Sequence, residues 1–294
     1  MKDIGVVSMN KEISTKELPH ILSEFALKAM LYEVSCYPAP GLVSPISTGA
    51  HKDMNHFTFI DSSLAISRFF CEAVESALKE EHEEKLFKSL RKIGVKAEEA
   101  MFTATDGINT QKGIIFLMLI SLGAVTLTIK RGKTFDEIEN YIRFMTKDIV
   151  EEDFRELEKK EKLTYGEKLY LKYGLKGIRG EVAKGLPIAL KLGLKVYEES
   201  RDLSENQRIA NTLIHIMTSC EDTTLLHRRP IETLYYVQNA AKEAVSLGAM
   251  RTEEGRKFID AMDRDFVKRG ISPGGSADLL AMTIFFHNVK SIVK

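Results

Sequence analysis

Apolar residues recur with helical spacing along most of this chain. Within residues 61–79 they come in pairs that return every four positions, which places them on one stripe of a helix. These pairs are Ala65 with Ile66, Phe69 with Phe70, Ala73 with Val74, and Ala77 with Leu78. Similar stripes occur in residues 16–35, 134–158, 206–220, 231–247, 252–268 and 277–293. Neither the alternation of a series of strands nor a βαβ rhythm is present. The sequence therefore predicts an all-α fold of roughly ten helices.

One segment needs to be weighed against a membrane span. Residues 113–129, GIIFLMLISLGAVTLTI, carry no charge and reach the lower edge of a spanning length. Hydroxyl side chains and a glycine dilute the run, and no second run of this kind exists. We therefore expect a helix buried in a large helical core, with no membrane contact. A mixed-charge segment at 147–168 reads as a solvated helix face, because it lacks the composition of a linker. We expect one domain over residues 1–294.

Charge and cysteine usage narrow the functional classes. The 42 basic residues equal the 42 acidic residues, so no global field favours nucleic acid. The three cysteines are widely spaced and form no CxxC pair, which is typical of a reducing compartment. The N-terminus has charges at Lys2, Asp3, Lys11 and Glu12 and lacks the apolar core of a signal peptide. These features predict a cytoplasmic protein.

Polar and glycine-rich residues gather in five corners between the expected helices. The five corners are residues 37–63, 105–113, 173–187, 219–230 and 271–280. The first is too long and irregular for a simple turn, and loops of that length are often functional. In the second, Lys112 opens the most apolar helix, where a cation needs an anion or a carboxylate to offset the positive helix end. We expect the active site to be built from these corners.

The residue types in the corners restrict the chemistry. HExxH, CxxC, GxSxG and Walker signatures are absent. Scattered carboxylates beside lysine, arginine and histidine instead fit Mg²⁺ bridging a polyphosphate. The Pro-Gly-Gly turn at 273–275 suits an anion, since it exposes backbone amides ahead of a helix. A purely structural reading also stands: Asp61 and Asp278 are helix caps or first-turn acids, and the turn is an ordinary corner.

The corners also resemble a known family, the triphosphoribosyl-dephospho-coenzyme A synthases, of which a related branch serves malonate decarboxylase. The matching blocks are EVSCYPAPGLVSPISTGAHKDMNHFTFIDSS, DGINTQKGIIF, YGLKGIRGEVAKGLP, EDTTLLHR and SPGGSADLLAMTIFF. They follow the family order from about residue 33 to 286 and so cover nearly the whole chain. Five blocks in the family order make the resemblance specific, whereas a single block would not.

The resemblance implies a reaction and its partners. The family transfers the 5-triphosphoribosyl group of ATP to the 2′-hydroxyl of 3′-dephospho-CoA and releases adenine. The product is the prosthetic-group precursor of citrate lyase and is destined for an acyl carrier subunit of that enzyme. Mg²⁺ is the expected cofactor, because the intact triphosphate needs a metal and cations. A homo-oligomer is compatible with this reading.

With the resemblance in view, roles are assigned to corner residues. Catalytic roles are expected for Asp53, Asp61 and Glu181, with Asp53 as the base or charge stabiliser. Metal ligands are expected at Glu181, Asp222 and Asp278. Substrate contacts are expected at His51, Lys52, Asn109, Lys112, Arg179, His227, Arg228, Ser272, Gly274, Gly275 and Ser276.

Two departures from the family pattern keep alternatives open. Ala39 and Ser44 stand where many relatives have a lysine and an acid, and Arg229 with Pro230 stand where a glycine pair often follows. The first two changes remove a phosphate contact and a metal contact. One alternative is a nucleotide- or CoA-binding module without turnover. The other is a helical ribosyl hydrolase, which would release adenine without an acceptor.

Overall fold

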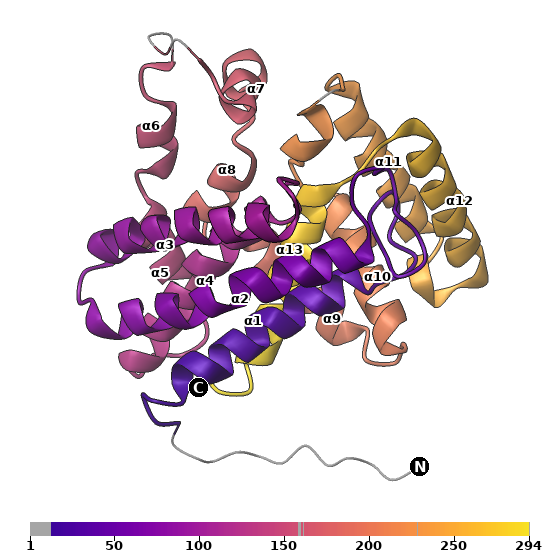
Figure 1. The fold of residues 1–294 in the computed structure, drawn as a ribbon. Coiled ribbons are helices and arrows are strands. Elements are labelled where there is room, and N and C mark those ends of the chain that lie inside the picture. The colour runs from indigo at the N-terminus through magenta and orange to yellow at the C-terminus, as the bar shows by residue number, and fades with distance from the viewer. Residues whose placement is uncertain (1–12, 158–159, 161, 228, 294) are drawn as a thin grey trace.

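The fold is built from helices joined by short corners (Figure 1). This computed structural model describes residues 13–157, 160, 162–227 and 229–293. Its α-helices are α1 Leu18–Val34, α2 His56–Lys79, α3 Glu83–Ala104, α4 Lys112–Lys130, α5 Glu137–Thr146, α6 Ile149–Phe154, α7 Tyr165–Tyr173, α8 Gly177–Ala183, α9 Leu194–Glu199, α10 Glu205–Met217, α11 Glu232–Ser246, α12 Glu253–Arg269 and α13 Gly274–Val289. A π-helix, η2, spans Ile188–Gly193, and two 3₁₀ turns are η3 Thr223–His227 and η4 Ala249–Arg251. No strand occurs within these residues, so the all-α prediction is confirmed.

Two apolar helices, α4 and α13, form the centre of the fold. They contact each other, and α1 and α2 lie against them on the face seen in Figure 1. Within the described chain, α4 is the one helix long and apolar enough to cross a membrane, and 78% of its apolar window is buried inside the fold. Its neighbours α2, α3, α5 and α13 cover it on several sides. The prediction of a helix buried in the core is confirmed.

Helix starts decide one of the alternatives raised by the sequence. Asn55 caps α2: its side chain accepts from the backbone of Thr58, and the Thr58 hydroxyl accepts from the Asn55 backbone N–H. Asp61 therefore lies in the second turn of α2, and Asp278 is the fifth residue of α13. The reading of these two acids as caps or first-turn acids is wrong, because both helices begin earlier than their apolar stripes indicate.

The long first corner packs onto the junction between α12 and α13. The Gly41 N–H donates to Asp263 Oδ1 at 2.9 Å. Gly41 has φ +73°, and a methyl group there would lie 2.0 Å from the Ile271 carbonyl oxygen. Only glycine permits this conformation together with such a close approach. The contact fixes the first corner beside the start of α13.

Candidate active site

The N-terminal turns of α13 are the place where the corners meet. From the first corner, His51 Nε2 lies 2.8 Å from Ser272 Oγ. From the fourth corner, Asp222 Oδ2 accepts from the Ser276 N–H at 2.9 Å. His51 is 221 positions and Asp222 is 54 positions away in sequence from the residue that it contacts, so two distant segments meet at the same short stretch. The fold brings together corners that the sequence could name only separately.

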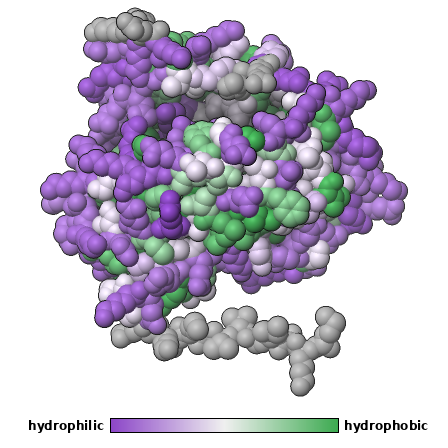
Figure 2. Space-filling model, viewed as in Figure 1, coloured by the Kyte–Doolittle hydropathy of each residue, from purple (hydrophilic) through white to green (hydrophobic). Residues whose placement is uncertain are grey.

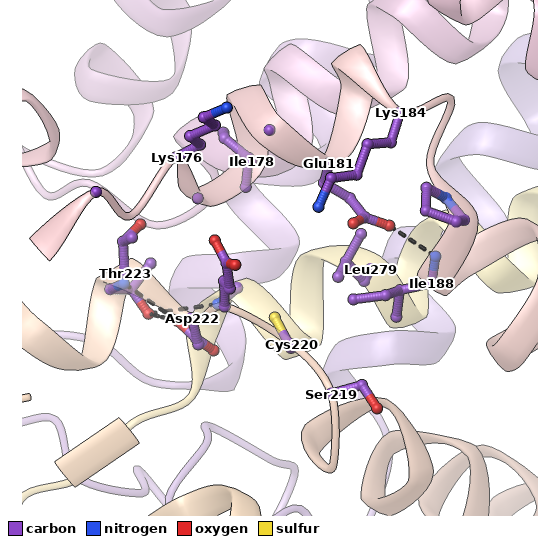
Figure 3. Close-up of a pocket in the computed structure, with 17 residues that line it drawn as sticks. Lys176, Ile178, Glu181, Lys184, Ile188, Ser219, Cys220, Asp222, Thr223 and Leu279 are labelled. Atoms are coloured by element: carbon purple, nitrogen blue, oxygen red, sulfur yellow. Dashed lines mark hydrogen bonds between the residues drawn. The ribbon is translucent and has the colours of Figure 1, made fainter. Parts of the chain in front are cut away.

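A cavity of about 430 Å³ opens between α8, residues 219–224 and the start of α13 (Figure 3). Gly275 and Leu279 of α13 form part of its wall. Its charged lining residues are Lys176, Glu181, Lys184, Glu221 and Asp222. Cavities of this size typically bind small molecules, and a lining with both positive and negative side chains suits a charged small molecule. The third, fourth and fifth corners all contribute to this cavity.

Asp222 anchors the fourth corner to α13. Its Oδ1 accepts from the Thr224 N–H at 3.1 Å and from Thr224 Oγ1 at 2.5 Å. Its Oδ2 accepts from the Ser276 N–H at 2.9 Å and from Ser276 Oγ at 3.2 Å. Burial raises the pKa of this carboxyl, and those hydrogen bonds oppose the shift. Because a carboxylate offers about four acceptor positions, direct metal binding by Asp222 would displace one of these bonds.

The glycine-rich turn before α13 has its amides already bonded. The Gly274 N–H donates to the Ser272 carbonyl at 2.9 Å, and the Gly275 N–H donates to Thr224 Oγ1 at 3.3 Å. The Ser276 N–H donates to the carboxylate described above. Protein acceptors thus occupy the donors that a phosphate would use. These contacts do not support the interpretation of the turn as a phosphate cradle.

Glu181 holds the opposite wall of the cavity. Its Oε1 accepts from the Ile188 N–H at 2.7 Å and so caps the π-helix η2. Burial raises the pKa of this carboxyl and the charge of Glu221 adds to the rise, while the hydrogen bond and the charge of Lys184 lower it. Glu181 therefore lines the cavity, as its expected roles require, and one of its carboxylate oxygens is hydrogen-bonded to the backbone. Its expected catalytic and metal roles stay predictions.

Asp278 and Glu33 are two acids that have no basic partner among the described residues. Asp278 lies against the first turn of α4, where a methyl group on Gly113 would be 1.9 Å from Asp278 Oδ2. Burial raises the pKa of Asp278 well above its usual range, and the charges of Asp222 and Glu33 raise it further. Glu33 is 6% exposed, and burial raises its pKa to about 8. Across the described chain, neither side chain has a hydrogen bond or ion pair.

Glu33 was absent from the residues assigned from the sequence, although it opens the first family block. The signal that could have identified it is local. Leu22, Ala26 and Met30 mark the buried stripe of α1, and Glu33 continues that stripe. An acid at a core-facing position is rare unless it is paired. Such an acid is a candidate functional group.

Replacing Glu33 with Gln should make the protein more stable at high pH and leave its stability nearly unchanged at low pH. The pKa of Glu33 is raised by folding, so its favourable contribution is present below about pH 4.5 and is lost as pH rises toward about 8. Over that range the stability difference should grow by up to about 1.4 kcal/mol per pH unit. Thermal melting at pH 5, 7 and 9 measures it. Glu24→Gln, on the exposed side of α1, is the matched control. A difference that does not change with pH would contradict the assigned burial.

Two of the basic residues assigned to substrate are paired with acids. Arg179 Nε donates to Asp153 Oδ2 at 2.6 Å, and Arg179 is not among the residues that line the cavity. Lys112 Nζ lies 2.7 Å from Glu98 Oε2, which confirms that a carboxylate offsets this lysine at the helix start. The Asn109 side chain accepts from the Lys112 N–H at 3.3 Å. In this structure these three side chains make intramolecular contacts, and their substrate contacts stay predictions.

The first corner places its assigned side chains near the surface. These side chains are His51, Lys52, Asp53 and Asp61. Asp53 is 64% exposed, with His51 Nδ1 at 3.9 Å, and burial lowers the pKa of His51. None of the four lines the cavity. In the fourth corner, Arg228 and the side chain of His227 lie outside the described residues.

Comparisons with known proteins give one consistent answer. The family model for ATP:dephospho-CoA triphosphoribosyl transferase matches residues 19–294. Protein CitXG of Leuconostoc mesenteroides subsp. cremoris is 41% identical, over 88% of this chain and 57% of that protein, so the chain spans just over half of this relative. A probable 2-(5″-triphosphoribosyl)-3′-dephosphocoenzyme-A synthase of Lactiplantibacillus plantarum is 39% identical, over 90% of this chain and 95% of its own length. A protein of the same name from Streptococcus mutans serotype c is 34% identical, over 96% of this chain and 100% of its own length. No solved structure matches.

Proposed function

This chain belongs to the ATP:dephospho-CoA triphosphoribosyl transferase family, and we propose on that basis that it transfers the 5-triphosphoribosyl group of ATP to the 2′-hydroxyl of 3′-dephospho-CoA. The observation that carries the proposal is the family match over residues 19–294, a range that includes every corner around α13. The product would be the precursor of the citrate lyase prosthetic group. The charged cavity beside α13 supports the proposal as a place for an anionic nucleotide.

The proposed reaction exchanges one bond at the ribose of ATP. The bond from ribose C1′ to adenine breaks, and a bond from C1′ to the acceptor oxygen forms. The acceptor hydroxyl loses its proton, adenine leaves with a proton, and the triphosphate stays on the ribose. Positive charge develops on the ribose ring in such reactions, and nearby carboxylates stabilise it.

Asp278 is the acid that best suits this requirement. It has no basic partner in the described structure, and it is next in sequence to Leu279 of the cavity wall, although Asp278 itself packs against Gly113 and does not line the cavity. Burial raises the pKa of Asp278 in the ligand-free protein, and a positive charge that develops beside it would favour its ionised form, which then stabilises that charge more strongly than a carboxylate in water does. Asp53, Asp61 and Glu181 remain the acids expected from the sequence. Of these, Glu181 alone lines the cavity.

The carboxylates allow only a limited protein contribution to an Mg²⁺ site. Within the described residues, no group of three or more His, Cys, Asp or Glu side chains could hold a metal ion. Asp222 has its acceptor positions filled, whereas Asp278 makes no hydrogen bond there and Glu181 commits a single oxygen. Mg²⁺ typically takes one or two carboxylates and completes its shell with substrate phosphates and water. Glu181 and Asp278 are the ligands that would serve such an ion, which when bound would neutralise phosphate charge.

The decisive experiment follows adenine release from ATP with and without 3′-dephospho-CoA. We expect release that depends on the acceptor, together with a product whose mass equals dephospho-CoA plus the triphosphoribosyl group. Release without acceptor would instead identify a ribosyl hydrolase. Binding of both nucleotides without release would identify a binding module, the role that Ala39 and Ser44 leave open.

Further expectations concern partners and location. We propose that the product passes to an acyl carrier subunit of citrate lyase and that the protein acts in the cytoplasm. Assembly into a homo-oligomer also stays a prediction. Apolar side chains gather over α1 and α2 in the middle of one face (Figure 2). Two apolar side chains of α2 are strongly exposed, Phe57 at 72% and Leu64 at 56%. Exposed apolar patches often mark association surfaces, so this face is the one to examine.

A further inference from the structure

We propose that Lys176 and Lys184, at the two ends of α8, bind the triphosphate of ATP inside the cavity. Neither lysine was assigned from the sequence, which pointed to Lys112, His227 and Arg228 as the phosphate contacts and to Arg179 as a further substrate contact. The inference rests on the proposed function for the identity of the nucleotide. Its basis is the position and pairing of the cations around the cavity.

The first observation is that the cavity has two basic lining residues and that both are unpaired. Lys176 precedes α8 and Lys184 follows it, and both line the cavity. Neither forms an ion pair with any residue that the structure describes. By contrast, Lys112 is paired with Glu98, and Arg179 with Asp153. A ligand anion would therefore meet two available charges in the cavity.

The second observation concerns how Lys176 is held. A methyl group on Gly180 would lie 2.6 Å from Lys176 Cβ and 3.5 Å from its Cδ. The aliphatic stem of Lys176 thus runs across Gly180, one turn further along α8, and a side chain at that position would displace it. Because the stem is held against the helix, Lys176 loses less conformational freedom when its ammonium group binds a ligand.

The third observation is the spacing of the two charges. Lys176 and Lys184 are eight residues apart along α8, which corresponds to about 12 Å along a helix axis. Lys184 reaches back alongside Glu181 over the cavity (Figure 3), and its charge acts on that carboxyl. Two long basic side chains at the two ends of one helix suit a chain of phosphates better than a single phosphate.

Two of the acids in the same cavity are engaged by the fold. Glu181 and Asp222 accept backbone hydrogen bonds that hold the walls together, and neither forms an ion pair with Lys176 or Lys184 in the described structure. Glu221 is the remaining acidic lining residue and is exposed. A triphosphate placed among these groups needs cations, because an uncompensated buried charge is costly.

The test measures binding of inorganic phosphate, diphosphate and triphosphate to the full chain by calorimetry. The unmodified protein should bind triphosphate most tightly. Lys176→Ala and Lys184→Ala should each weaken triphosphate binding about tenfold or more, as expected for loss of a hydrogen bond to a charged group. Lys184→Arg should retain most of the affinity. Lys195→Ala, an exposed lysine of α9 paired with Glu199, is the matched control and should change nothing.

Two results would overturn the proposal. One is unchanged triphosphate affinity in folded Lys176→Ala and Lys184→Ala proteins. The other is a comparable loss in Lys112→Ala or Arg179→Ala without any loss in the α8 variants. Circular dichroism of each variant confirms that the helices are present.

Failure of this inference is distinguishable from failure of the proposed function. If adenine is released and the KM for ATP is the same in the α8 variants, the transferase stands and the lysine assignment fails. If no adenine is released but triphosphate binding depends on both lysines, the site stands and the transferase assignment fails.

Discussion

Replacing Asp278 with Asn should slow the transfer at least a hundredfold while leaving the protein as stable as before, or more stable. The loss of rate follows if Asp278 stabilises the developing charge or takes the acceptor proton, since loss of a general base typically costs about 10²–10⁴-fold. The gain in stability follows from its surroundings. Burial and the charges of Asp222 and Glu33 disfavour ionisation of Asp278, so its pKa is raised by folding. A neutral amide of the same size removes this repulsion and still fits against Gly113.

The measurement combines the rate of adenine release with a melting curve at pH 8. Because the pKa of Asp278 is raised, ionising it costs stability as pH rises, so any gain from Asn should be larger at pH 8 than at pH 5. Asp53→Asn and Asp61→Asn are the matched comparisons, as both acids are exposed whereas Asp278 is partly buried. If Asp53→Asn abolishes turnover and Asp278→Asn does not, the base assigned from the sequence is right and the assignment of Asp278 fails.

Replacing Asp222 with Ala should destabilise the protein by at least about 1–3 kcal/mol, the cost of leaving one buried hydrogen-bond donor without an acceptor. The side chain is 2% exposed and accepts four hydrogen bonds from Thr224 and Ser276. Alanine would leave those buried donors without acceptors and would open a void beside Gly275, whose added methyl group would lie only 2.8 Å from Asp222 Oδ1.

Urea denaturation measures this effect, with Glu221→Ala as the control. Glu221 is adjacent in sequence and exposed, and surface substitutions usually change stability by less than about 0.5 kcal/mol. A loss below about 1 kcal/mol for Asp222→Ala, the net value of one ordinary hydrogen bond, would contradict the anchoring role. It would return Asp222 to the set of side chains available to a metal.

The fold class was predictable because helical periodicity is a local property. The stripe in residues 61–79 lies on α2, and the uncharged run at 113–129 is the interior of α4. The starts of the helices were harder to predict from the sequence. The polar first turn of α2 lacks the apolar stripe, so the sequence suggested Asp61 as a cap. In the structure, Asn55 and Thr58 cap this helix instead.

The corners that build the candidate site were also predictable, as residue types that gather in irregular segments. Their individual roles were not. Lys112 and Arg179 are basic residues in the expected corners, yet each forms an ion pair with an acid from another helix. The two lysines that line the cavity lie in the third corner and in one of the matching family blocks, yet no role was assigned to them from the sequence.

The sequence by itself determined the all-α class, the buried position of α4, the family, and the corners that supply the candidate site residues. These properties depend on spacing and residue type within short windows. Tertiary structure alone decided that Asp222 anchors α13, that the turn amides are occupied, and that the charge of Glu33 acts on Asp278, which has no basic partner in the described part of the chain. The physical reason is that a side chain's charge state and free acceptors depend on what surrounds it. In this protein those surroundings come from segments tens to hundreds of residues away.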